Sequence, residues 1–349
     1  MAEIPTTQKQ YRLQHFEGTH GLTLFPSEPV ETPQRKQVLV RLHAASLNFR
    51  DILISRGQFG SFSFPPGLIP LSDGAGQVVA LGDEVTSFQI GDRVCGTFFE
   101  TWQDGPITPD NVSRALGATV PGVLAQYRVF EESALIKFPS HLSYEQASTL
   151  PCAAVTAWSA LNENGVKAGP GETVLIIGTG GVSLFGLQFA VRAGCQVMVL
   201  SSSDEKLKLA QSLGASFLIN YKKHPDWEIK VREITNGKGV DHVLEVGGEG
   251  TLNRSLDAVR LGGHVHIIGV LAKSAGTCSG FGEKVLYSSV QMRGIYIGSR
   301  GVFERMNKSI EINEIKPVVD RVFDFENVKE AFEYLASGKH FGKVVIRID

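Results

Sequence analysis

A strand, a glycine turn and a helix follow one another near the middle of the chain, and this succession constrains the fold more than any other feature of the sequence. Residues 173–177 are apolar and rich in β-branched side chains, which is typical of a parallel strand covered on both faces. Gly178, Gly180 and Gly181 then permit a tight turn and a close backbone approach. A helix from Val182 would direct its first N–H groups and its positive dipole end at that turn. The pattern predicts a βαβ unit that binds a pyrophosphate.

The glycine pattern is an incomplete dinucleotide fingerprint, because Ser183 stands where the last glycine of Gly-x-Gly-x-x-Gly is usual. The surrounding sequence strengthens the interpretation, since a second apolar segment at residues 196–200 follows about one βαβ unit later. A glycine turn in a purely structural βαβ unit is the alternative.

Length and charge narrow the class of protein. A chain of 349 residues with 42% hydrophobic residues exceeds the size at which single cores usually divide, so we expect two domains. A net charge of −2 argues against nucleic-acid and membrane-surface partners and leaves a small-molecule substrate. The first ten residues lack an apolar signal core and we find no apolar segment long enough to cross a membrane, so we expect a cytoplasmic protein.

The cysteines indicate neither a disulfide framework nor a zinc site. The four cysteines are scattered singly, without a Cys-x-x-Cys pair. We therefore expect reduced, buried thiols. They are Cys95, Cys152, Cys195 and Cys278.

The pattern of apolar segments and turn residues changes near Ser143. Up to about Leu135, short apolar segments alternate with turn dipeptides, which favours a compact β-barrel-like domain. Beyond Ser143, apolar strands alternate with amphipathic helices, which predicts an α/β fold with a doubly wound parallel sheet. The individual expectations are a helix at 144–162, strands at 196–200, 217–220, 240–245 and 263–270, helices at 204–213, 227–235 and 251–259, an edge strand at 290–297, and a tail with a helix at 328–337 and a strand at 343–348.

Several motifs resemble the medium-chain dehydrogenase/reductase superfamily over nearly the whole chain, and within it the zinc-free quinone oxidoreductase-like branch, whose members often carry zinc-type alcohol dehydrogenase-like names. The motifs lie at residues 48–51, 69–76, 85–94, 150–161, 178–183, 262–263 and 342–345. The resemblance implies a GroES-like β-barrel catalytic domain of residues 1–142 and 300–349, and a Rossmann NADP-binding domain of residues 143–299. It further implies an active site in the cleft and a homodimer formed through the Rossmann edge strands, at residues 290–297.

The resemblance also bears on whether the chain binds zinc. Zinc-dependent relatives place a cysteine before an acidic residue and a Gly-His-Glu, whereas residues 49–51 here read Phe-Arg-Asp and residues 71–73 read Leu-Ser-Asp. The four clustered cysteines of those relatives have no counterpart in residues 96–149. Asp51 and Asp73 could hold a metal, but without a nitrogen or sulfur partner we favour carboxylates that order the cleft by hydrogen bonds. We expect no zinc.

The end of the second Rossmann strand bears on the choice of cofactor. NAD-specific domains place an acidic residue there, but Ser201 occupies the place in this chain. The resemblance to NADPH-dependent quinone reductases implies that Ser202, Lys206 and Tyr221 serve the 2′-phosphate, so we expect NADPH rather than NADH.

Three observations leave that expectation open to an alternative. Ser202 and Glu205 could form a capping box, Lys206 could be a solvated helix charge, and Asp204 could reach an adenosine ribose.

The resemblance assigns further residues to the cofactor and the reaction. Asn48 would border the nicotinamide ribose, and Asn48 and Asp51 would orient the reactants. Ordinary core packing is an equal alternative for Thr156, Val270 and Phe341, and His43, His264 and His266 suit the core better than catalysis. The expected cofactor-binding residues are Asn48, Thr156, Gly180, Gly181, Val182, Ser183, Ser202, Lys206, Tyr221, Gly269, Val270, Phe341 and Lys343.

The expected reaction follows from the charge that a hydride brings. The acceptor accumulates negative charge, which a simple ketone localises on oxygen and a conjugated acceptor spreads. Phe59 stands where related enoyl-thioester reductases carry a catalytic tyrosine. We therefore expect NADPH-dependent reduction of a quinone or an α,β-unsaturated carbonyl. An alcohol dehydrogenase and a low-turnover cofactor-binding scaffold are the alternatives.

Overall fold

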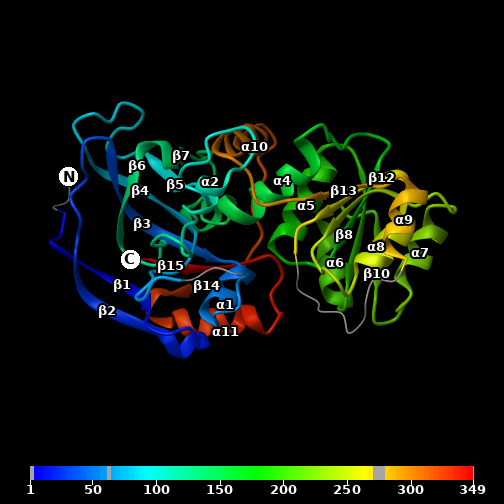
Figure 1. Ribbon diagram of the computed structural model, residues 1–349, viewed down its shortest axis with the longest axis horizontal. Coiled ribbons are helices and arrows are strands. Elements are labelled where there is room, and N and C mark those ends of the chain that lie inside the picture. Colours follow the sequence, from blue (N-terminus) through cyan, green and yellow to red (C-terminus); the bar gives the residue numbers. More distant parts are fainter. Residues whose placement is uncertain (1–3, 61–63, 270–279, 349) are drawn as a thin grey trace. The chain divides into compact units, whose positions relative to one another are not determined.

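The computed structural model describes residues 4–60, 64–269 and 280–348 and divides into two compact units (Figure 1). One unit comprises Met1–Val155 and Ser299–Asp349, and the other comprises Thr156–Gly298. The predicted boundary at residue 142 is therefore too early. Residues 143–155 belong to the first unit because they pack on its strands; for example, the Oγ atom of Ser46 donates to the carbonyl oxygen of Ser148 over 3.0 Å.

The second unit is built on a six-stranded parallel sheet in the order β10-β9-β8-β11-β12-β13 (Figure 1). Taken in chain order, the strands lie 3-2-1-4-5-6, so the order reverses between β8 and β11, where doubly wound sheets bind ligands. The strands are β8 (Thr173–Ile177), β9 (Gln196–Ser201), β10 (Phe217–Asn220), β11 (Val240–Glu245), β12 (Val259–Ile267) and β13 (Gln291–Gly294). The predicted parallel sheet is confirmed.

Helices follow the strands of this sheet and cover it (Figure 1). They are α4 (Val155–Asn162), α5 (Gly181–Arg192), α6 (Asp204–Ser212), α7 (Trp227–Ile234), α8 (Leu252–Ala258) and α9 (Phe281–Ser288). Trp227 and Val231 of α7, four residues apart on one helix face, pack with strand residues such as Val243 in the core. The helical period of the sequence thus places apolar side chains on the sheet.

The first unit contains a seven-stranded sheet to which both ends of the chain contribute. Its strands are β3 (Gln37–Leu47), β4 (Asp73–Leu81), β5 (Arg93–Gly96), β6 (Tyr127–Glu131), β7 (Leu135–Lys137), β14 (Val319–Asp324) and β15 (Lys343–Arg347), with β1 (Thr7–Leu13) and β2 (Leu22–Pro29) forming a separate hairpin. Strand β15 runs antiparallel to β3, so that Val344 pairs with Leu47. The C-terminal strand therefore lies beside the residues that precede Asn48.

Short helices connect these strands. They are α1 (Phe49–Ser55), α2 (Pro109–Val112), α3 (Tyr144–Ala147), α10 (Arg300–Ile312) and α11 (Val328–Ala336), with the turns η1 (Gly18–Gly21), η2 (Glu132–Ala134), η3 (Leu150–Ala154) and η4 (Phe325–Asn327). Helix α1 begins directly after β3. The end of one buried strand thus fixes where the N-terminus of α1 lies.

Three predicted elements differ from the structure. The single helix at 144–162 is wrong: Pro151, which lacks an N–H, lies in the π-helical turn η3 that separates α3 from α4. The strand at 263–270 begins earlier, at Val259, and ends at Ile267, while Val270 lies outside the described residues. The edge strand at 290–297 is shorter, Gln291–Gly294.

Candidate active site and cofactor-binding segments

Asn48 and Asp51 lie together at the start of α1. Asn48 has extended backbone dihedrals as the N-cap of the helix. Its backbone N–H donates to the Oδ2 atom of Asp51 over 2.7 Å. A carboxylate in the first helical turn is favoured by the helix dipole as well. The two residues predicted to orient the reactants are therefore fixed to each other by local helix geometry.

Lys343 reaches Asn48 from the opposite end of the chain. The side chain of this lysine is 3% exposed, and its Nζ atom donates to the carbonyl oxygen of Leu47 over 2.7 Å and to Oδ1 of Asn48 over 2.6 Å. It also lies 3.9 Å from Oδ2 of Asp73. Because Oδ1 of Asn48 accepts from an ammonium group, the amide is held with its Nδ2 atom on the other side, and this donor has no partner among the described residues.

Asp73 is fully buried and bonded by the protein itself. Its Oδ1 atom accepts from the Ser72 hydroxyl over 2.6 Å, and its Oδ2 atom accepts from the backbone N–H of Cys152 over 3.2 Å. Burial and the nearby Asp73 carboxylate raise the pKa of the Cys152 thiol. The Cys152 side chain is thus held as a neutral thiol, as expected for a buried cysteine.

The pKa of Asp51 is displaced toward neutral pH. Burial raises the pKa of its carboxyl to about 6, and this effect outweighs the lowering by Arg50 and by the hydrogen bond from Asn48. The Oδ1 atom of Asp51 has no hydrogen-bond partner among the described residues. A carboxyl group with such a pKa exchanges protons close to neutral pH.

The glycine turn has the geometry that a bound anion requires. Gly178 has φ +78°, which glycine adopts readily, and the Ser183 hydroxyl donates to the carbonyl oxygen of Ile177 over 2.8 Å. The serine in place of the last glycine therefore closes the turn. Gly180 caps α5 and accepts from the N–H of Leu184, so the N–H groups of residues 181–183, including Val182, form the first turn and can face a phosphate. These residues fit a pyrophosphate.

The segment after β9 corrects one alternative. Ser203, rather than Ser202, caps α6: its hydroxyl accepts from the N–H of Lys206 over 3.3 Å and donates to Glu205 over 2.6 Å. A capping box that starts at Ser202 is therefore wrong by one residue. Ser202 and Lys206 are both half-buried, on either side of this cap.

Asp204, the carboxylate that could have reached a ribose, is engaged elsewhere. It accepts from Nδ2 of Asn220 over 2.7 Å and from Nζ of Lys223 over 2.6 Å. These bonds lower the pKa of Asp204, with the Asn220 bond the largest cause. Tyr221 follows β10 and is 40% exposed. Tyr221 thus follows the end of β10, and Asp204, which is paired with Lys223, follows the end of β9.

The remaining predicted cofactor residues lie in diverse settings. Thr156 is buried in α4, and its Oγ1 atom has no hydrogen-bond partner among the described residues. Gly269 follows β12, and a Cβ atom there would lie 2.2 Å from the carbonyl oxygen of Val246, so close packing demands the glycine. Phe341 is buried beside β15. The site role of each of these residues stays a prediction.

Three histidines form a stacked cluster in the second unit, as expected of core residues. The ring centroids of His242 and His264 are 4.9 Å apart, and those of His242 and His266 are 5.5 Å apart. Nε2 of His242 lies 3.3 Å from Oε2 of Glu172. Burial lowers the pKa of all three rings, that of His266 to about 2. The cluster is uncharged at neutral pH.

The described residues contain neither a cluster of potential metal ligands nor a membrane-spanning helix. Within residues 4–60, 64–269 and 280–348, no group of three His, Cys, Asp or Glu side chains could hold a metal ion. No helix in this part of the chain is long and apolar enough to span a membrane.

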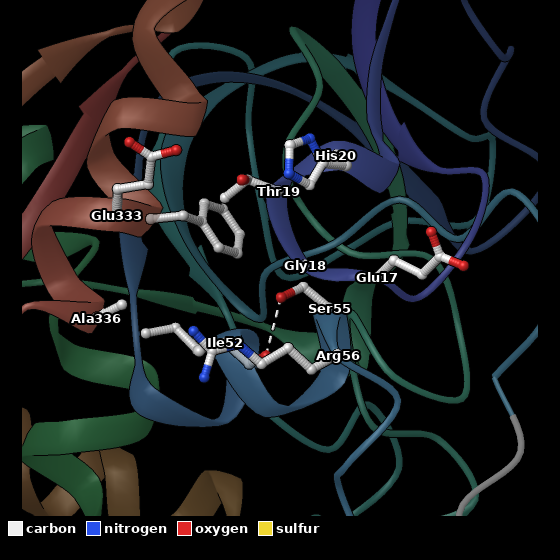
Figure 2. A pocket seen from close by; sticks show the side chains of 10 residues that line it. Glu17, Gly18, Thr19, His20, Ile52, Ser55, Arg56, Glu333 and Ala336 are labelled. Atoms are coloured by element: carbon white, nitrogen blue, oxygen red, sulfur yellow. Dashed lines mark hydrogen bonds between the residues drawn. The ribbon is translucent and has the colours of Figure 1, made fainter.

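A pocket in the first unit lies at the other end of α1 (Figure 2). Its volume is about 240 Å³, and the residues that line it come from around η1, from α1 and from α11. In this pocket the Ser55 hydroxyl donates to the carbonyl oxygen of Ile52 over 2.8 Å. The lining residues are Glu17, Gly18, Thr19, His20, Ile52, Ser55, Arg56, Phe332, Glu333 and Ala336. The predicted site residues lie elsewhere.

Two polar residues escaped the sequence prediction. Glu245 is fully buried at the end of β11 and accepts from the N–H groups of Gly247 and Gly248 and from the hydroxyls of Thr251 and Ser255, so it shapes the loop after β11. In the sequence, Glu245 could have been identified as a single carboxylate at the end of an apolar strand. The other residue is Arg50, which lies inside the motif at 48–51 and is 8% exposed.

Comparison with known proteins agrees with this architecture. The family described as "Alcohol dehydrogenase GroES-like domain" matches residues 34–140, and the family described as "Zinc-binding dehydrogenase" matches residues 181–312. A zinc-type alcohol dehydrogenase-like protein of Schizosaccharomyces pombe is 45% identical over 338 residues, which cover 94% of this chain and 96% of that protein. A chloroplastic NADPH-dependent alkenal/one oxidoreductase of Arabidopsis thaliana is 30% identical over 349 residues, 99% of this chain and 81% of that protein.

A solved structure shows the same fold. The crystal structure of an alcohol dehydrogenase-type protein from Sinorhizobium meliloti 1021 superposes with a TM-score of 0.91 at 38% identity, covering 99% of this chain and 100% of the other. A GroES-like unit together with a doubly wound parallel sheet defines an oxidoreductase of the alcohol dehydrogenase type. The chain belongs to the medium-chain dehydrogenase/reductase superfamily, in its quinone oxidoreductase-like branch.

Proposed function

We propose that this oxidoreductase uses NADPH to reduce a quinone or an α,β-unsaturated carbonyl compound, and that it does so without zinc. The bonding of Asp73 and Asp51 carries the proposal. Zinc-dependent relatives place a cysteine and a histidine in the segments that here read Phe49-Arg50-Asp51 and Leu71-Ser72-Asp73, and here Asp73 is bonded to Ser72 and Cys152 and lies near the Lys343 ammonium group. The carboxylate thus has protein donors and a protein counter-ion in place of a metal.

The donors around Asn48 suit a conjugated acceptor. A simple ketone gathers the full negative charge of reduction on one oxygen and benefits from a Lewis acid. A quinone or an enone spreads the charge, so hydrogen-bond donors and positioning contribute more of the rate enhancement. The Nδ2 atom of Asn48, which Lys343 holds as a directed donor, supplies such a contact in this proposal.

The cofactor proposal rests on the tips of β9 and β10. NAD-specific sites need an acid at the end of the second strand, but Ser201 occupies it, and Asp204 is engaged by Asn220 and Lys223. The NADPH-dependent relative of Arabidopsis thaliana supports the same choice. Ser202, Lys206 and Tyr221 would hold the 2′-phosphate, and residues 180–183 the pyrophosphate. When bound, NADPH supplies the two electrons and the hydrogen of a hydride.

Turnover assays test the proposal directly. Purified protein should oxidise NADPH with 1,4-benzoquinone and with a simple enone, and a chelator should leave the rate unchanged. The proposal fails if neither acceptor is reduced while primary or secondary alcohols are oxidised with NAD(P). One zinc per chain after exhaustive dialysis would reject the zinc-free part alone.

Alcohol oxidation is the alternative that the name of the Schizosaccharomyces pombe relative favours. It requires an alcohol to lose its proton as the hydride leaves, and hence a base or a Lewis acid close to the oxygen. Asp51, with a pKa near 6, is the candidate base. Loss of alcohol oxidation in an Asp51→Asn variant, with quinone reduction absent in the wild type, would favour this alternative.

The proposed assembly is a homodimer through β13. This strand ends the six-stranded sheet and pairs with β12 on one side, so its other edge offers unpaired backbone groups that a second copy can bond. A two-fold axis at this edge would join two sheets into one.

A further inference from the structure

Unpartnered polar atoms gather around the first turn of α1. Four buried atoms there have no hydrogen-bond partner among the described residues: Nδ2 of Asn48, Nε and Nη2 of Arg50, and Oδ1 of Asp51. Most buried polar groups in native proteins are bonded, and each exception needs an explanation. A bound ligand is the simplest one when several exceptions share one helical turn.

Arg50 contributes two of these atoms and is the least expected residue of the group. Its side chain is 7% exposed, although a buried guanidinium is costly unless its donors are bonded. Within the part of the chain that the structure describes, its single hydrogen bond runs from Nη1 to the carbonyl oxygen of Leu116 over 3.0 Å. Its nearest carboxylate oxygen, Oδ1 of Asp51, is 3.9 Å from Nη1. The charge is thus only partly compensated by the protein.

Aromatic rings supply the other contacts of Arg50. The guanidinium carbon lies 4.5 Å from the ring centroid of Phe98 and 5.4 Å from that of Phe59. Phe59 lies between α1 and β4, and Phe98 follows β5. Cation–π contacts hold the guanidinium plane but leave the N–H bonds on its edge unused.

The unused N–H bonds share one edge of the guanidinium. Nε–H and one N–H of Nη2 point in the same direction, which is the fork that binds an oxyanion or a carbonyl oxygen. Both nitrogens are closed to solvent in this structure. Phe98 is fully buried, whereas Phe59 is half-buried.

We propose that Arg50 is a catalytic residue that binds the acceptor's carbonyl oxygen, on which negative charge develops during reduction. This inference rests on the proposed function. Bound NADPH would supply a hydride to the β-carbon of an enone, and the electron pair of the C=C bond would shift toward oxygen, giving an enolate whose oxygen Arg50 would hold. A proton from water would then add to the α-carbon. For a quinone, the same charge resides on a phenolate oxygen.

Binding of 4-nitrophenol tests the assignment without turnover, because its visible absorption reports the ionised phenolate. The titration uses the full chain, with and without NADP⁺. We expect the wild-type protein to bind the phenolate form, and Arg50→Met to weaken that binding by at least about tenfold, as loss of a charge-assisted hydrogen-bond pair implies. Arg50→Lys should recover only part of the affinity, because an ammonium group lacks the two-pronged edge.

Arg93→Met is the matched control. Arg93 also lies over two aromatic rings of the first unit, 4.7 Å from Phe138 and 4.8 Å from Tyr144, but its donors are bonded to the carbonyl oxygens of Ser140 and Leu142. This variant should lose stability comparable to Arg50→Met and keep phenolate binding. Thermal unfolding of both variants separates misfolding from loss of the binding group.

The outcomes distinguish this inference from the proposed function. Equal phenolate affinity of wild type, Arg50→Met and Arg50→Lys would overturn the role of Arg50, even if NADPH-dependent quinone reduction is observed. Arg50-dependent phenolate binding in a protein that reduces neither quinones nor enones would support the oxyanion site and reject the proposed reaction. In an active enzyme, Arg50→Met should lower kcat more than it raises KM, because the charge is greatest in the transition state.

Discussion

The Nζ atom of Lys343 donates to Oδ1 of Asn48 over 2.6 Å, although 295 residues separate the two in the chain. The pairing of β15 with β3 brings them together. The same ammonium group bonds the Leu47 carbonyl oxygen and lies near Asp73. One buried lysine therefore connects the end of β3, the cap of α1 and the Asp73 carboxylate, and it determines which atom of the Asn48 amide is left to donate.

Replacing Lys343 by methionine should damage both stability and activity. The variant leaves Asp73 buried near no ammonium group, and breaking a buried charge pair costs about 3 kcal/mol of unfolding free energy. Asn48 also loses the contact that orients its amide, so kcat/KM should fall. Urea unfolding and steady-state kinetics measure the two effects. Lys339→Met, an exposed lysine of the same tail, is the control, and a Lys343→Met protein as stable as this control would contradict the prediction.

Asp51 should make the protein less stable as the pH rises through weakly acidic values. Its folded pKa of about 6 lies above the ordinary value of 3.8, so the folded state binds this proton more tightly than the unfolded state does. The stabilisation is complete below about pH 4 and is lost by about pH 6, a change of about 3 kcal/mol. Asp51→Asn should abolish this component, as urea unfolding at the two pH values would show.

Other groups titrate in the same range, so the informative quantity is the difference between wild type and variant. Asp83→Asn, at an exposed aspartate, should follow the wild-type pH dependence. If Asp51→Asn also follows it, the Asp51 carboxyl is not displaced as described.

The histidine cluster should destabilise the protein at acidic pH. Burial holds the folded pKa of His242, His264 and His266 below the ordinary 6.5, so the stabilisation by the neutral rings is present above pH 6.5 and is lost as the pH falls. For His266 the loss approaches about 1.4 kcal/mol per pH unit. His266→Gln should flatten the decline between pH 6.5 and 5 in urea unfolding, whereas His20→Gln, at an exposed histidine, should not.

Local sequence pattern was sufficient for the Rossmann strands β8, β10 and β11 and for the glycine turn. The strand at β8, Gly178 and the helix after Gly181 are encoded by neighbouring residues, and β10 and β11 have the predicted bounds. Their hydrophobic period and turn residues specify them without tertiary information. The family motif at 48–51 likewise placed Asn48 and Asp51 together.

The features that escaped prediction depend on contacts distant in sequence or on a shift of one residue. The bond from Lys343 to Asn48 requires the pairing of β15 with β3, which periodicity does not reveal. The choice of Ser203 over Ser202 as the cap of α6 depends on where β9 ends, and helix ends are the least certain features of a pattern. The aromatic surroundings of Arg50 combine two loops that local sequence leaves unplaced.

The edge of β13 should mediate a homodimer. Light scattering at micromolar concentration should give twice the mass of one chain. Gln291→Lys places a charge on this exposed edge, and across a two-fold axis the two copies repel, which should shift the protein toward monomer. Leu209→Lys, at an exposed position of α6, should remain dimeric. A wild-type monomer would reject the dimer, and a dimeric Gln291→Lys protein would place its interface elsewhere.

Lys206 should determine the preference for NADPH. Lys206 lies in the first turn of α6, close in sequence to the end of β9 and to Ser202, and loss of its proposed contact with a 2′-phosphate would raise the KM for NADPH by about tenfold. The KM for NADH should change little, because NADH lacks that phosphate. Lys208→Ala, an exposed lysine two residues further along the helix, is the control for general electrostatic attraction. Direct titration of NADP⁺ and NAD⁺ binding separates affinity from turnover. If Lys206→Ala weakens the binding of NADP⁺ and NAD⁺ equally, Lys206 does not recognise the 2′-phosphate.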